Sequence, residues 1–82
     1  MKFNKYVEKI EHEYKHLSEL TTEMCTFCKE LQHNEHYLAK DKETQEKICE
    51  YADYISDEIT IARDELKLTL KLLKNIQDEM QK

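Results

Sequence analysis

Apolar residues recur along this chain in alternating steps of four and three. The first run consists of Phe3, Val7, Ile10, Tyr14, Leu17, Thr21, Met24, Cys28, Leu31, Glu35 and Leu38. The second run consists of Ile48, Ala52, Ile55, Ile59, Ala62, Leu66, Thr69, Leu73, Ile76 and Met80. Such spacing places a stripe along one face of an α-helix. The pattern predicts an all-α protein with helices over residues 3–38 and 46–80.

The two runs do not share a phase, which indicates a break between them. Continuing the first run leads to Lys42, Gln45, Cys49, Ala52 and Ser56, and this frame omits Ile48, Ile55 and Ala62. The polar segment between the runs contains Asp41 and Thr44, both suitable residues to cap a helix. We therefore expect one domain over residues 1–82, folded as a long, coiled-coil-like antiparallel hairpin with its loop at residues 39–45.

Two other architectures remain open at this point. One is a single uninterrupted helix in a parallel coiled coil, because nothing in the polar segment forbids helix. The other is a compact bundle of three or four helices, with breaks at residues 33–36 and 56–58, where the sequence offers capping residues. For the hairpin, one register pairs every stripe residue from Val7 to Glu35 and sets Cys28 opposite Ile59, Met24 opposite Ala62 and Val7 opposite Met80.

The apolar residues outnumber what a two-helix seam needs. Beside the main stripes lie Tyr6, Leu20 and Phe27 in the first half, and Tyr51, Tyr54, Ile61, Leu68, Leu70 and Leu72 in the second. Exposed apolar surface of this kind marks interfaces. We expect the interface to consist of Leu20, Phe27, Tyr51, Tyr54, Ile61, Leu68 and Leu72, and the hairpin to dimerise into a four-helix bundle. A monomer that folds back more tightly is the alternative.

Charge divides the chain into a central acidic part and two weakly basic ends. Residues 19–65 hold 13 acidic and 5 basic residues, whereas residues 1–18 have a net charge of +1 and residues 66–82 of +2. The acidic surface is expected to include Glu50, Asp53, Asp57, Glu58, Asp64 and Glu65. It argues against direct binding of nucleic acid, which requires a basic face. It suits a basic protein partner, or serves only as a solvated face.

Two histidines have the spacing of a zinc-hydrolase helix. His12, Glu13 and His16 form H-E-x-x-H, which places two imidazoles one turn apart beside a glutamate. A zinc site also needs a third protein ligand, and the segment expected opposite, residues 70–75, contains no carboxylate. We expect no catalytic residue, no cofactor and no metal here.

A second metal-like pattern combines Cys25 and Cys28 with His33 and His36. On a continuous helix the ends of this group are about 16 Å apart, too far for one tetrahedral ion. Buried thiols that pack as small apolar groups are the expected role of these cysteines. Cys49 aligns away from both, so no internal disulfide is expected.

The chain contains neither glycine nor proline, and it shows no apolar run long enough for a signal peptide or a membrane span. With three cysteines, these features favour the cytoplasm and no membrane partner. The predicted function is a non-enzymatic interaction module: a regulator, inhibitor or assembly factor of bacterial or phage origin that binds itself and another protein. A metal-binding helical protein and an acidic decoy of a nucleic-acid-binding groove are the alternatives.

One short motif points to a further alternative. Tyr54 and Glu58 form Y-x-x-x-E, which resembles the export signal of the small helical hairpins handled by type VII secretion systems. The Trp-x-Gly turn of that family is missing. The resemblance implies a small helical hairpin that is exported.

Overall fold

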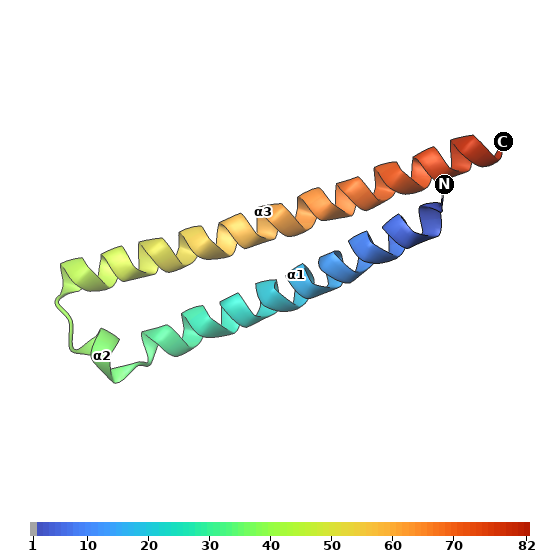
Figure 1. The fold of residues 1–82 in the computed structure, drawn as a ribbon. Helices are drawn as coiled ribbons and strands as arrows, with labels where there is room; N and C mark the ends of the chain where they lie inside the picture. Colours follow the sequence, from blue (N-terminus) through green and yellow to red (C-terminus); the bar gives the residue numbers. More distant parts are fainter. Residues whose placement is uncertain (1) are drawn as a thin grey trace.

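Three helices make up the computed structural model, which describes residues 2–82. Helix α1 spans Phe3–Gln32, α2 spans Glu35–Leu38 and α3 spans Lys42–Gln81. The two long helices run antiparallel, with both termini at one end and α2 at the other (Figure 1). The molecule measures 62 × 16 × 14 Å. The expected all-α helical hairpin is confirmed.

Local sequence explains why the long helices are uninterrupted. The chain lacks glycine and proline, the two residues that most disfavour a helix interior. Threonines within the helices donate their hydroxyls to the carbonyl four residues earlier, as Thr21 Oγ1 does to Leu17 O at 2.7 Å. The break considered at residues 56–58 does not occur, since α3 continues through Ser56.

The first helix ends earlier than the apolar pattern predicts. It stops at Gln32, because Asn34 takes an extended conformation and its Oδ1 accepts the backbone N–H groups of His36 and Tyr37. This side chain starts α2 as a separate short helix. Of the breaks allowed by the sequence at residues 33–36 and 56–58, the first is therefore present.

The second long helix begins four residues before the expected position. Asp41 Oδ1 accepts the backbone N–H of Thr44 at 3.3 Å, so α3 starts at Lys42. Hydrogen bonding from Thr44, mainly through its side chain and less through its backbone N–H, lowers the pKa of the Asp41 carboxyl. The role expected for Asp41 is confirmed, while the segment expected as loop at residues 42–45 is helix.

Gln45 holds the turn closed. Its Nε2 lies 3.1 Å from Tyr37 O, 3.4 Å from Leu38 O and 3.2 Å from Lys40 O. These carbonyls lie at the end of α2, where a helix leaves acceptors unpaired. The Tyr37 hydroxyl lies 3.0 Å from Cys49 Sγ and ties the same turn to α3.

The earlier start of α3 changes which residues meet across the hairpin. Cys28 Sγ lies 3.9 Å from Ala52 O, and Asn4 Oδ1 accepts a hydrogen bond from Gln77 Nε2 at 3.1 Å. Cys28 thus lies opposite Ala52, seven residues from the expected partner Ile59. The register predicted from the sequence is wrong, because α1 ends and α3 begins earlier than expected, which centres the turn earlier in the chain.

The face that α3 presents to α1 also differs from the prediction. Most of its buried or half-buried positions continue the frame of the first run, and these are Gln45, Cys49, Ala52, Ser56, Ile59, Arg63, Leu66, Leu70, Leu73 and Gln77. Thr44, Ile48, Thr60 and Ala62 are half-buried beside that frame. Ile55, Ile76 and Met80, expected in the seam, are 46%, 53% and 71% exposed. The first run of α1 is confirmed, since its residues from Phe3 to Leu31 are all buried or half-buried.

The seam forms a thin core. Among residues 2–82 only Ala52 and Thr21 are buried, and no large side chain is fully enclosed. Eleven large apolar side chains of the described chain are exposed. Two helices packed along one seam leave the remaining apolar surface in water, which is costly for a chain of this size.

Candidate interaction surface

One broad side of the hairpin is apolar, and both long helices contribute to it. On α1 it comprises Tyr6, Leu20 and Phe27, and on α3 it comprises Ile48, Tyr51, Ile55, Ala62, Leu72 and Ile76. We call these residues the apolar face. On each helix these residues lie at helical spacing beside the seam. Because the helices are antiparallel, the two flanks face the same side of the hairpin.

An apolar groove shows that the two helices meet on this side. It has a volume of about 190 Å³ and lies near the turn. The residues that line it are Phe27 and Leu31 from α1, and Ile48, Tyr51, Ala52 and Ile55 from α3. Every one of these side chains carries mainly carbon surface, so the groove suits another apolar side chain.

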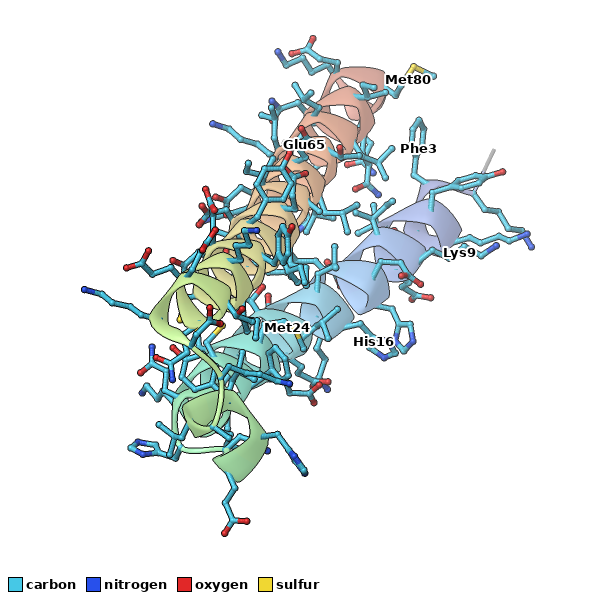
Figure 2. The ribbon with its side chains drawn as sticks, turned by 90° about the vertical axis from the view of Figure 1, so that its left-hand side faces the viewer. Phe3, Lys9, His16, Met24, Glu65 and Met80 are labelled. Carbon is cyan, nitrogen blue, oxygen red and sulfur yellow. The ribbon has the colours of Figure 1, made fainter. Side chains whose placement is uncertain are left out.

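A second hollow lies at the opposite end of α3. Its volume is about 440 Å³, and Leu72, Ile76 and Met80 line it together with Asn75 and Glu79. Met80 projects at the end of the molecule that carries Phe3 (Figure 2). The apolar face therefore has a hollow near each end.

The seven residues expected as one interface fall into two groups. Leu20, Phe27, Tyr51 and Leu72 belong to the apolar face, where Leu20 is half-buried and the others are exposed. Tyr54, Ile61 and Leu68 recur every seven residues on a different row. At about 100° per residue this row points away from α1. We call it the outer row, and its members are 67%, 51% and 55% exposed.

The sequence pattern missed Ile55 and Ile76 as surface residues because it assigned them to the seam. The signal that identifies them was present, since the frame of the first run continues through Ala52 and Ser56 and excludes them. Polar residues in that frame, such as Gln45 and Arg63, concealed it.

The other broad side of the hairpin is polar. Glu11 and Lys74 form an ion pair across the two helices at 3.4 Å. Exposed acidic residues of α3 follow the same side, namely Glu46, Glu50, Asp53, Asp57 and Asp64. Asp64 is paired with Arg63 at 3.2 Å. Glu58 and Glu65 lie in the same seven-residue row as Tyr51 and Leu72, so they interrupt the apolar face along its edge on α3 (Figure 2 labels Glu65).

The histidine pair lies on the outside of α1. The ring centroids of His12 and His16 are 4.3 Å apart, and both residues are exposed. Figure 2 shows His16 pointing away from α3. Over residues 2–82, no three side chains of histidine, cysteine, aspartate or glutamate converge to hold a metal ion.

The cysteines of the hairpin are free thiols. Cys25 is exposed, whereas Cys28 and Cys49 are half-buried in the seam. The hydrogen bond with Cys49 raises the pKa of the Tyr37 hydroxyl, which favours its neutral form in the turn. Cys28 and Cys49 therefore act as packing and hydrogen-bonding groups in this structure.

Comparisons with protein-family models, curated proteins and solved structures find no significant match. None of the helices between residues 2 and 82 is long and apolar enough to cross a membrane. The feature that sets this hairpin apart from a simple solvated one is the apolar face, and its geometry carries the functional argument.

Proposed function

We propose that this protein is a non-enzymatic protein–protein interaction module that acts as a dimer. In this proposal the apolar face of one hairpin packs on the same face of a second copy, and the two form a four-helix bundle. The observation that carries it is the contrast between eleven exposed large apolar side chains and two buried residues among residues 2–82. Packing against a second hairpin would bury apolar side chains that α1 and α3 leave exposed when they pack only against each other.

The size of the apolar face supports this proposal. The broad side of the hairpin that carries the apolar face measures 62 × 16 Å, a projected area of roughly 1,000 Å². Stable interfaces bury about 800 Å² on each partner. Face-to-face packing of two hairpins thus buries enough surface for a stable complex.

The outer row remains free in such a bundle. Tyr54, Ile61 and Leu68 lie on the far side of α3 from α1, so a second hairpin on the apolar face leaves them accessible. We propose that this row, bordered by Glu58 and Glu65, contacts a further protein. A regulator, inhibitor or assembly factor would use the bundle as a rigid support for that contact.

Thermal unfolding at several protein concentrations tests the proposal. Folded chains associate and unfolded chains do not, so a higher protein concentration stabilises the folded state by mass action and raises the Tm. We expect the Tm, measured by circular dichroism, to rise steadily over a hundredfold range of protein concentration. A Tm that stays constant over that range would contradict the dimer.

A further inference from the structure

A charge gradient follows the edge of the apolar face on α1. The residues concerned recur every seven positions and are all exposed: Lys2, Lys9, His16, Glu23 and Glu30. Lys9 and His16 lie on the same outer side of α1 (Figure 2). The row is basic near the termini, acidic near the turn, and has His16 at its centre.

The charges of this row are complementary to those of the same row on a second, antiparallel α1. When a second α1 is laid antiparallel across the first with His16 as the centre, Lys9 falls opposite Glu23 and Lys2 falls opposite Glu30. In the neighbouring row, about a centre between residues 16 and 17, Tyr6 falls opposite Phe27 and Glu13 falls opposite Leu20. A two-fold interface requires this property, because residue i contacts j and j contacts i.

Helix α3 independently gives nearly the same centre. Since Cys28 lies opposite Ala52 and Asn4 opposite Gln77, His16 is level with roughly residue 64. Reversing α3 about that level sets Tyr51 opposite Ile76 and Ile55 opposite Leu72. The residues that line the groove near the turn of one copy thereby lie over the residues that line the hollow near the termini of the other.

We infer that the second copy in the proposed dimer lies antiparallel, with its turn over the termini of the first and the two-fold axis beside His16. This inference rests on the dimer proposed above. It places the acidic central part of one copy, which has a net charge of −8 over residues 19–65, alongside the basic ends of the other. Opposite charges brought together in this way attract the two copies and also determine their relative orientation.

The other two-fold arrangement of the same faces is disfavoured by charge. With the two turns at the same end, α1 of one copy lies over α3 of the other. Lys2 then falls near Glu79, but Lys9 falls near Lys71 and Leu72, Glu23 falls near Glu58, and the acidic halves of both copies lie together. Like charges placed against each other destabilise an interface.

Lysine cross-linking of the unmodified protein tests the orientation. Within one chain Lys42 and Lys82 are separated by the 40 residues of α3, about 60 Å, beyond the span of a short cross-linker. We expect cross-links that join Lys40 or Lys42 to Lys82 or Lys5, in the dimer fraction only. An equal mixture of ¹⁴N- and ¹⁵N-labelled chains identifies them as links between copies.

The outcomes separate this inference from the dimer itself. Links between the turn lysines of two copies, with none to the termini, would show a dimer in the other orientation and overturn the inference alone. A chain that stays monomeric would overturn both.

A charge exchange provides a second test. We expect Lys9→Glu to raise the dimer dissociation constant roughly tenfold, because Glu23 then faces a like charge in both halves of the interface. The double variant Lys9→Glu/Glu23→Lys should recover the original constant. Lys15→Glu, an exposed lysine away from the face, is the matched control and should change it little. No recovery in the double variant would contradict the antiparallel pairing.

Discussion

Replacing Ile55 and Leu72 with glutamate is expected to convert the protein into monomers that lose much of their helix. Both side chains are about half exposed in the single hairpin, at 46% and 53%, so a partner copy has about half of each to bury. Each contributes about 1 kcal/mol on that basis, and a dimer contains four of them. The loss of about 4 kcal/mol corresponds to roughly a thousandfold weaker dimer.

The helix content should fall together with the mass. The seam alone buries only Ala52 and Thr21 within residues 2–82, so the isolated hairpin has little to hold its helices together. Light scattering and far-ultraviolet circular dichroism measure the two effects on the same sample.

The outer row offers a matched control for this experiment. Ile61→Glu/Leu68→Glu introduces the same charges at residues of similar exposure, 51% and 55%, on the same helix. We expect this variant to remain dimeric and helical. If it dissociates while Ile55→Glu/Leu72→Glu does not, the outer row rather than the apolar face is the dimer interface.

Enlarging Ala52 to phenylalanine is expected to destabilise the hairpin by about 1–3 kcal/mol, the usual cost of overpacking a filled site. Ala52 is only 6% exposed, and its carbonyl oxygen lies 3.9 Å from Cys28 Sγ. A phenyl ring at this position must either push the helices apart or enter the groove that Ala52 helps to line, where it would obstruct a partner copy. The midpoint of urea unfolding, measured at fixed protein concentration, reports the change.

Glu50→Phe controls for the intrinsic helix preference of phenylalanine. Glu50 lies on the same helix two residues earlier, and its side chain is exposed. We expect the midpoint of urea unfolding of the Glu50→Phe variant to stay near that of the original protein. Equal destabilisation by the two substitutions would mean that the helices are not closely packed at Ala52.

Much of the architecture was predictable because it depends on local signals. The four-three spacing identifies both long helices, and the Asp41 cap is visible as an aspartate at the end of a polar segment. The end of α1 at Gln32 also has a local cause, since Asn34 followed by Glu35 is a typical helix start. Apolar residues on both sides of that point hid it.

The register was not predictable from periodicity, because α3 carries two apolar rows with the same spacing. One row contains Ile59, Leu66 and Leu73 and faces α1, while the other contains Ile55 and Ile76 and faces outward. The position of the turn in the chain decides between them. That position depends on the Asn34 and Asp41 caps and on tertiary contacts, such as the hydrogen bonds from Gln45 to the end of α2.

Polar residues in the seam made the correct row look unsuitable. Gln77 occupies a seam position and donates a hydrogen bond to Asn4, while Arg63 packs its aliphatic part and directs its guanidinium to Asp64. Long polar side chains accept such positions because the stem is apolar and the end reaches solvent. The surplus of apolar residues was predictable from the sequence, whereas its division into an apolar face and an outer row required the structure.

The solution mass measured by light scattering, with and without a chelator, tests the central claim most directly. The account predicts a particle of twice the 10.0 kDa chain mass, unchanged when divalent metals are removed. A mass of 10.0 kDa at all concentrations for a chain that retains its helices would contradict the dimer.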